Sequence, residues 1–431
     1  MPFCRCKTAV FMLMILIYST SFLLSGTGHA RAALSEPAIQ AKSALLMDCY
    51  SGRVLYEKNG YEQLPPASVT KIMTALLVAE KGGLDEIVEI SSTAANTRES
   101  GIYLQAGERM TRLQLLYACM LPSANDAAVA LAESVSGSVE GFVELMNKRA
   151  TELGMHDSHF CNPHGLHQKD HYTTAYDLAL LARAALQNST LREVVGTQNI
   201  VIPGPPGEED RSIWNQNRLL YRYENALGIK TGYTREAGNC VVGAAERDEM
   251  PLIAVSLNSS AVYDDLMGMM DYGFAQYQVV SLDDSENPLL VKVIGGEDKN
   301  VIAQPAEEIR IAVTAEEIQQ LSCRFLPVAE VRAPVREGDL LGVCQVYLHG
   351  QDIASINLIA AASIEAKPSL IKSMAAWSLS LSKWAIMILL LYLLLKNTKV
   401  QEMLKSTLRF MVLKIIRKPP PRNRSTRNRH F

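Results

Sequence analysis

The sequence predicts an α+β protein with a second, smaller all-β domain and a C-terminal apolar helix. Helical and strand patterns alternate over residues 37–276, whereas residues 281–366 show only strand patterns separated by Gly or Pro. An apolar segment follows at residues 374–395. With 431 residues, 48% hydrophobic and 20% charged, the chain is long enough to bury the cores of two domains.

The first domain opens with a predicted hairpin, in which strands at Ser43–Asp48 and Val54–Tyr56 are joined by a Gly-containing turn. Two prolines end this unit, and Ser68 is expected to begin a helix. Two further helices and three strands of an antiparallel meander are predicted at residues 113–120, 126–134, 228–232, 240–245 and 251–257.

The second domain is predicted to contain short strands only. They are expected at residues 289–294, 309–313, 329–332, 343–348 and 353–359. Their spacing is typical of a small all-β domain. Because this segment carries no cluster of catalytic side chains, we interpret it as a spacer.

The N-terminus has the pattern of an export signal. Arg5 and Lys7 precede an apolar run at residues 9–24, and the small residues Ala30 and Ala32 follow, at the spacing where a signal peptidase would cut. We therefore expect a signal peptide at residues 1–32, with an uncleaved membrane anchor as the alternative. Either interpretation puts the folded domains outside the cytoplasm.

The C-terminus has the pattern of a membrane attachment. The apolar segment 374–395 is long enough to span a bilayer if Lys383 pairs or snorkels, and the basic tail 396–431 would then lie in the cytoplasm. The alternative is an in-plane amphipathic helix held by anionic lipids. The adjacent apolar run explains the basic charge better than nucleic-acid binding does.

Charge is distributed unevenly along the chain. With three basic residues at 1–33 and a net charge of +10 over 396–431, the whole-chain charge of −3 leaves −16 for residues 34–395. So acidic a segment argues against nucleic acid as a partner. An anionic substrate must therefore be held by individual cations close to the site.

No metal or other cofactor is expected. Five histidines lie within sixteen residues, between His156 and His171, but no His-Glu-x-x-His pattern accompanies them. We therefore interpret them as loop histidines and disfavour a metallopeptidase. The eight cysteines include no Cys-x-x-Cys pair, and sequence alone does not decide whether those outside the signal form disulfides.

Three short motifs carry the predicted chemistry, in the order Ser68-Val-Thr-Lys71, Ser123-Ala-Asn125 and Lys230-Thr231-Gly232. The first two patterns also recur elsewhere by chance, for example the Ser-x-x-Lys pairs that begin at Ser369 and Ser380. Lys-Thr-Gly occurs once, against a chance expectation of about 0.1. Each motif therefore gains its significance from the residues around it.

Ser68 and Lys71 are expected to share one face of a helix. The apolar stripe of this helix is formed by Val69, Ile72, Met73, Leu76 and Leu77. A spacing of three residues lets the Lys71 amine reach the Ser68 hydroxyl, so that a neutral lysine can activate the serine. Desolvation and a second cation, for which Lys230 is the candidate, favour the neutral amine. The alternative is a helix-capping serine with a solvated lysine.

The other two motifs supply polar groups around this pair. Ser123 and Asn125 lie in a predicted turn, where the hydroxyl can relay a proton and the amide can bind a peptide; simple helix capping is the alternative. On a predicted strand, Lys230 and Thr231 can hold a carboxylate, and Gly232 lets a substrate backbone approach closely. The alternative for this strand is a turn with a surface lysine.

These motifs resemble those of the penicillin-recognising serine peptidases, and the chain is similar to low-molecular-mass penicillin-binding proteins, the serine D-Ala-D-Ala carboxypeptidases. The resemblance covers about residues 37–276, and the segment to about residue 366 is similar to the family's C-terminal domain. Further similar segments are Ser100-Gly-Ile-Tyr-Leu, Asn162-Pro-His-Gly-Leu, Thr173-Thr-Ala-Tyr-Asp-Leu-Ala and Asn215-Gln-Asn-Arg-Leu-Leu.

The resemblance implies a β-lactamase/transpeptidase-like fold with an antiparallel sheet, and a function for each motif residue. Ser68 is implied to be the acylated nucleophile, Lys71 its base and Ser123 the relay that protonates the departing D-alanine. Asn125 and Thr231 would orient the peptide, and Lys230 would bind its carboxylate. The backbone N–H groups of Ser68 and Tyr233 would form the oxyanion hole.

The implied partners are peptidoglycan stem peptides ending in D-Ala-D-Ala, β-lactam antibiotics as covalent inhibitors, and the cell membrane. Two alternatives use the same nucleophile: a sensor that is acylated without turnover, and a β-lactamase. The middle motif, Ser-Ala-Asn, and the absence of a Glu-x-x-Leu-Asn element between Asn125 and Lys230 favour the carboxypeptidase.

Overall fold

The computed structural model describes residues 35–205, 207–282, 289–306, 308–367 and 370–416. The predicted signal peptide at 1–32 and the end of the basic tail lie outside these ranges. The chain divides into two compact units. Among the described residues, the first holds those up to 291 together with 302–329 and 338–361, and the second holds 292–301, 330–337 and those from 362 onward.

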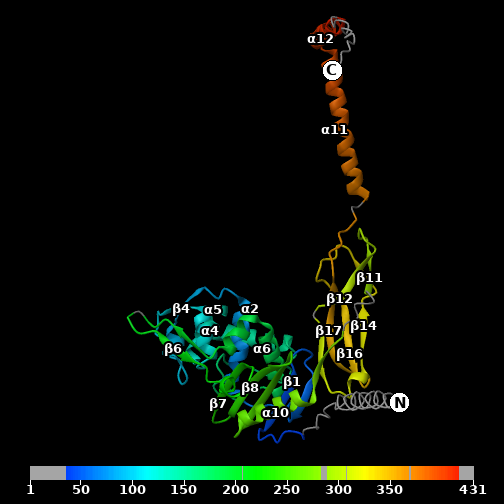
Figure 1. The fold of residues 1–431 in the computed structure, drawn as a ribbon. Coiled ribbons are helices and arrows are strands. Elements are labelled where there is room, and N and C mark those ends of the chain that lie inside the picture. The colour runs from blue at the N-terminus through cyan, green and yellow to red at the C-terminus, as the bar shows by residue number, and fades with distance from the viewer. Residues whose placement is uncertain (1–34, 206, 283–288, 307, 368–369, 417–431) are drawn as a thin grey trace, which may run out of the picture. The chain divides into compact units, whose positions relative to one another are not determined.

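A five-stranded antiparallel sheet in the order β2-β1-β9-β8-β7 forms the centre of the first unit (Figure 1). Its strands are β1 (Ser43–Asp48), β2 (Val54–Lys58), β7 (Ala226–Thr234), β8 (Gly238–Arg247) and β9 (Met250–Ser259). The predicted hairpin and meander are both present. The chain thus brings its first strands beside its last, with β1 next to β9.

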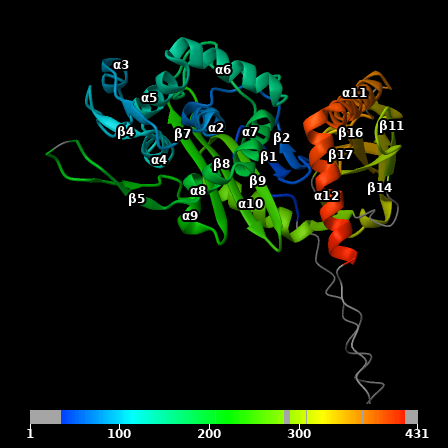
Figure 2. The ribbon, with the colours of Figure 1, turned by 90° about the horizontal axis from the view of Figure 1, so that it is seen from above.

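Helices cover both faces of this sheet, and α10 lies on the face opposite α2 and α7 (Figure 2). The helices are α2 (Lys71–Lys81), α3 (Ser92–Ala95), α4 (Arg112–Met120), α5 (Asn125–Ser136), α6 (Val139–Glu152), α7 (Ala175–Gln187), α8 (Ser189–Gly196), α9 (Leu219–Arg222) and α10 (Val262–Gln276). Alternate β1 side chains enter two cores: Leu45 and Met47 pack with α2, and Ala44 and Leu46 with α10. The predicted α+β class is confirmed.

Between α10 and residue 367 the described residues form mainly strands, as the sequence predicts, with one short 3-10 helix at Ile318–Gln320. The strands are β10 (Gln278–Leu282), β11 (Leu289–Ile294), β12 (Asn300–Pro305), β13 (Ile309–Val313), β14 (Leu321–Pro327), β15 (Glu330–Arg332), β16 (Leu340–Leu348) and β17 (Gln351–Ala360). In the first unit, β14, β16, β17 and β12 are neighbours in that order, and β10 pairs with β13. In the second unit, β11 and β15 pair in parallel. The sequence prediction missed β10, β12 and β14.

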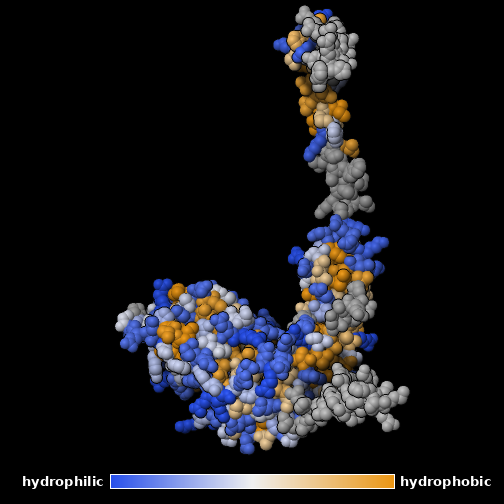
Figure 3. All heavy atoms as spheres, viewed as in Figure 1, coloured by the Kyte–Doolittle hydropathy of each residue, from blue (hydrophilic) through white to orange (hydrophobic). Residues whose placement is uncertain are grey.

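Two helices end the described chain, α11 (Leu370–Lys396) and α12 (Thr398–Ile416). Hydrophobic side chains are exposed along residues 381–394 of α11 (Figure 3). Within the described residues, neither helix alone has both the length and the hydropathy needed to cross a membrane. Residues 381–394 and 398–414 meet those criteria together, with a bend of 77° between them.

Asp265, in the first turn of α10, connects that helix to the sheet. Its buried carboxylate accepts hydrogen bonds from the backbone N–H groups of Gln40, at 2.7 Å, and Ala41, at 3.0 Å. It also accepts hydrogen bonds from the hydroxyls of Ser256 and Ser259 on β9. A buried carboxylate with four donors holds three segments together, and its loss would leave those donors unpaired.

We therefore expect Asp265→Ala to lower the free energy of unfolding by about 3 kcal/mol. The matched control is Asp264→Ala, because the neighbouring side chain is 70% exposed and pairs with Arg222 at the surface. That control should cost about 1 kcal/mol or less. Urea unfolding of the full-length chain measures both values. Equal urea midpoints for the two variants would contradict this account of Asp265.

Candidate active site

The first motif places a serine and a buried lysine in contact. Ser68 lies in a single 3-10 turn, Ala67–Thr70, and Lys71 is the first residue of α2. Ser68 is expected to begin a helix, but the α-helix begins one turn later, at Lys71. The residues that follow Pro66 first form the tighter 3-10 turn. The Lys71 amine donates a hydrogen bond of 3.0 Å to the Ser68 hydroxyl.

Lys71 is completely buried and makes two further hydrogen bonds. Its amine donates to Asn125 Oδ1 at 2.7 Å and to the carbonyl oxygen of His164 at 2.8 Å. Each acceptor is neutral, so no carboxylate in direct contact stabilises the charged amine. Burial lowers the pKa of Lys71 to about 8, which places this amine within reach of neutral pH as a base.

The third motif lies on β7, directly against the serine turn. A Cβ atom added to Gly232 would come within 2.7 Å of the Ser68 backbone nitrogen, so only glycine permits this approach. Lys230 is buried, and its amine donates to the carbonyl of Thr231 at 3.2 Å. Burial, reinforced by the charge of Lys71, lowers the pKa of Lys230 to about 7.

The middle motif connects the lysine to a loop beside the site. Asn125 receives the Lys71 amine, while its own backbone N–H donates to Ser100 O at 2.7 Å and its side-chain amide donates to Arg98 O at 3.0 Å. Ser123 has a positive φ of 67°, a conformation that is strained for a serine. Its hydroxyl is buried without a hydrogen-bond partner among the described residues.

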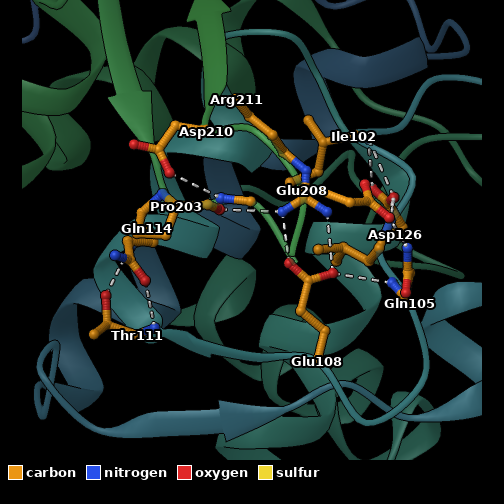
Figure 4. A network of polar contacts seen from close by, with 12 residues as sticks. Ile102, Gln105, Glu108, Thr111, Gln114, Asp126, Pro203, Glu208, Asp210 and Arg211 are labelled. Carbon is orange, nitrogen blue, oxygen red and sulfur yellow. Dashed lines mark hydrogen bonds and ion pairs between the residues drawn. The ribbon is translucent and has the colours of Figure 1, made fainter. Parts of the chain in front are cut away.

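The loop between β3 (Ile87–Glu89) and β4 (Arg109–Thr111) is held in place by two carboxylates (Figure 4). Asp126 accepts the backbone N–H groups of Ile102, at 3.2 Å, and Leu104, at 3.1 Å. Glu108 binds Arg211 through both carboxylate oxygens, which connects the loop to the hairpin of β5 (Asn199–Ile202) and β6 (Arg211–Trp214). Both carboxylates are more than 90% buried, so these contacts are shielded from water.

The histidine-rich segment packs beside the serine turn as structural support. His164 contributes its backbone carbonyl to Lys71, and burial lowers the pKa of its imidazole to about 3. His171 contacts the Thr70 hydroxyl at 2.8 Å, and burial lowers its pKa to about 4. Both rings are therefore neutral at pH 7. Across the part of the chain that the structure describes, no three His, Cys, Asp or Glu side chains are grouped to hold a metal.

These elements surround a pocket of about 520 Å³. Five of the eight predicted site residues line it: Ser68, Ser123, Thr231, Gly232 and Tyr233. The other three, Lys71, Asn125 and Lys230, are buried and do not line it. The structure thus brings all three motifs together around one serine.

Sequence reasoning did not identify several residues of this site. The pocket is also lined by Ser100, Asn215, Gln216, Arg218, Asn239, Cys240, Val241, Val262 and Tyr263. Ser100, Asn215, Gln216 and Arg218 belong to segments already noted for their resemblance, which was the available signal for them. The carbonyl of His164 gave no signal, because any residue type presents the same backbone oxygen.

Comparisons with known proteins agree with this geometry. Residues 30–261 match the family described as D-alanyl-D-alanine carboxypeptidase, and residues 274–366 match the one described as penicillin-binding protein 5, C-terminal domain. The D-alanyl-D-alanine carboxypeptidase DacF of Bacillus subtilis is 35% identical, over 81% of this chain and 91% of the relative. DacC of Escherichia coli is 29% identical, over 80% of this chain and 89% of the relative.

Solved structures are similar over the same region. Penicillin-binding protein 5 from Haemophilus influenzae has a TM-score of 0.62 and 26% identity, covering 77% of this chain and 99% of that chain. The Streptomyces K15 DD-transpeptidase has a TM-score of 0.54 and 34% identity, covering 56% of this chain and all of that one. These similarities confirm the predicted family and fold. The chain belongs to the D-alanyl-D-alanine carboxypeptidase family of low-molecular-mass penicillin-binding proteins and is a hydrolase, a D-Ala-D-Ala carboxypeptidase.

Proposed function

We propose that this enzyme removes the terminal D-alanine from peptidoglycan stem peptides through an acyl-enzyme on Ser68. The contact of 3.0 Å between the Lys71 amine and the Ser68 hydroxyl, at the wall of the pocket, carries the proposal. A serine hydroxyl is a weak nucleophile unless a base takes its proton. Lys71 is the one group within hydrogen-bond distance of this hydroxyl among the described side chains.

Burial makes Lys71 a usable base. With a pKa of about 8, about one amine in ten is neutral at pH 7, against about one in three thousand at the usual value. The neutral amine can accept the Ser68 proton while its own N–H groups still donate to Asn125 and the His164 carbonyl. The base therefore keeps its position in either protonation state.

In the proposed acylation step, Ser68 Oγ attacks the carbonyl carbon between the two D-alanines, and its proton passes to Lys71. The oxyanion is stabilised by the backbone N–H groups of Ser68 and Tyr233. The close approach of Gly232 to the Ser68 nitrogen supports this pairing. The C–N bond then breaks, and Ser123 relays a proton to the departing amine of D-alanine.

In the proposed deacylation step, water attacks the ester on Ser68, and the trimmed peptide leaves. Asn125 and Thr231 orient the peptide backbone, and the terminal carboxylate lies near the Thr231 hydroxyl with the charge of Lys230 behind it. A β-lactam presents a strained amide to the same hydroxyl, so we infer that it acylates Ser68 as well. No step of this reaction requires a metal or a redox cofactor.

We expect Ser68→Ala to abolish covalent labelling by fluorescent penicillin and to lower D-alanine release from a D-Ala-D-Ala pentapeptide by at least about 1,000-fold. The matched control is Ser380→Ala, because Ser380 begins a second Ser-x-x-Lys pattern in α11. Mass spectrometry of the labelled peptide identifies the modified residue. Labelling at another position would refute the proposed nucleophile, and rapid clearance of penicillin would favour a β-lactamase.

The pKa of Lys71 sets the expected pH dependence. Only the neutral amine accepts the proton, so the second-order rate of acylation by a β-lactam should rise about tenfold per pH unit below pH 8 and level off above it. Rates measured by stopped flow between pH 6 and pH 10 check this, with circular dichroism confirming that the fold persists. A rate independent of pH between 6 and 9 would exclude Lys71 as the base.

We further propose that the enzyme is exported and held at the outer face of the cytoplasmic membrane by its C-terminus. Leu381–Leu394 of α11 is apolar and exposed, and α12 turns away from it by 77°. On α12, Leu404, Leu408 and Met411 lie along one side, while Lys405 and Arg409 lie on another. This arrangement suits a helix in the plane of an anionic lipid surface, beside an inserted α11.

Replacing Lys405 and Arg409 together by Gln should weaken binding of the full-length protein to vesicles containing phosphatidylglycerol. Each cation near such a surface contributes about 1 kcal/mol, so a loss of about 30-fold is expected. The control is the double replacement of Arg192 and Arg247, two arginines of the first domain. Flotation with neutral and anionic vesicles measures both. Equal binding of the wild type to the two vesicle types would argue against the in-plane helix.

A further inference from the structure

Arg218 is the accessible positive charge of the active-site pocket. Its side chain is exposed and lines the pocket together with Ser68 and Thr231, and the described lining residues include no Asp or Glu. Lys71 and Lys230 are close by but fully buried, and neither lines the pocket. A negatively charged group that enters the pocket therefore meets a guanidinium first.

The backbone of Arg218 is fixed while its head group is unengaged. Its N–H donates to the Tyr263 hydroxyl at 3.1 Å, and the neighbouring Gln216 N–H donates to Leu121 O at 3.0 Å, two residues before Ser123. Asn217 Oδ1 accepts the backbone N–H of Leu219, the first residue of α9. The guanidinium itself has no ion pair or hydrogen bond to any described residue.

Arg218 is one of several arginines without an ion pair among the described residues, and it is the one of them that lines the pocket. Others, such as Arg211, Arg222 and Arg192, pair with an acid in this segment of net charge −16. An arginine left unpaired on a pocket wall, with a rigid backbone beneath it, is placed to receive an external anion. Arginine binds carboxylates through two parallel N–H donors, which adds geometric selectivity to the charge.

Lys230, which the proposed reaction places behind the terminal carboxylate, supplies a charge that depends on pH. Burial lowers the pKa of Lys230 to about 7, and its amine donates to the Thr231 carbonyl. At pH 7 the amine of Lys230 is therefore neutral in about half of the molecules. A guanidinium keeps its charge at every physiological pH, so Arg218 can hold an anion while the lysines change their protonation state.

We propose that Arg218 is a specificity-determining residue that binds a carboxylate of the stem peptide. This inference rests on the proposed function of the pocket, because the substrate must lie in the cavity beside Ser68. Two carboxylates at the D-alanine end of a stem peptide, from the third residue onward, have the required chemistry. One is the terminal α-carboxylate of D-alanine, and the other is the side-chain carboxylate of a diamino dicarboxylic acid at the third position.

The test uses the full-length enzyme and three pentapeptides. The first has lysine at the third position and a free terminus, the second has a diamino dicarboxylic acid there, and the third has lysine and a terminal carboxamide. We expect Arg218→Gln to lower kcat/KM about 10-fold, mainly through KM, on a peptide that carries the recognised carboxylate. This loss of kcat/KM should disappear on the peptide that lacks the recognised carboxylate. Arg218→Lys should retain part of the wild-type kcat/KM.

The pattern of losses identifies which carboxylate is bound. If Arg218→Gln lowers kcat/KM on the two peptides with free termini but not on the carboxamide, Arg218 binds the terminal carboxylate. If it lowers kcat/KM on the second peptide alone, Arg218 binds the side-chain carboxylate. Added salt should raise KM for the wild type and leave that of Arg218→Gln nearly unchanged. Equal losses on all three peptides, or no loss on any, would overturn the proposal.

Two controls separate this inference from the proposed function. Arg192→Gln removes an arginine that pairs with Glu246 at the surface and does not line the pocket, so its kinetics should match the wild type. Penicillin labelling of Ser68 in Arg218→Gln shows that the nucleophile is intact. If the wild type is not labelled at Ser68 and does not release D-alanine, the proposed function is wrong. If the wild type is active and Arg218→Gln has the same kcat/KM on all three peptides, only the role of Arg218 is rejected.

Discussion

The site depends on one buried amine. Lys71 brings together Ser68 from its own chain segment, Asn125 from the start of α5 and the His164 carbonyl from a third segment, all within 3.0 Å. An ammonium without a carboxylate in contact is costly to bury, so its environment favours proton loss and compensates the charge with neutral acceptors. The packing that positions the base therefore also lowers its pKa, through burial. Burial of Lys71 thus contributes both to the packing of the site and to its catalysis.

Much of the fold could be predicted because its elements have local signals. The β1–β2 hairpin and the β7–β8–β9 meander consist of strands with apolar residues between turn residues, so their patterns are visible in short windows. By contrast, β12 and β14 alternate exposed and half-buried or buried side chains and contain polar residues such as Gln304 and Arg324, which resemble loop sequence. Their pairing with distant strands decides their structure, and no local window contains that information.

The candidate site was predictable where it depends on side-chain chemistry. Three motifs identified the serine, both lysines and the residues around them, and the structure gathers all of them at one pocket. The contacts that could not be predicted involve backbone groups or residues that are far apart in the sequence. The His164 carbonyl carries no residue signature, and Asp126, which looks like an ordinary first-turn acid of a helix, is occupied with the loop at Ile102 and Leu104.

The distribution of charge around the pocket separates two tasks that a single lysine would combine poorly. A base must lose its charge at working pH, whereas an anion anchor must keep it. Burial depresses the pKa of both Lys71 and Lys230, so a site relying on these amines for substrate binding would lose affinity as the base becomes active. An exposed guanidinium at position 218, in a segment of net negative charge, keeps a local attraction for carboxylates that proton transfer does not alter. Placing the permanent charge at the pocket wall and the titratable charges beneath it resolves this conflict.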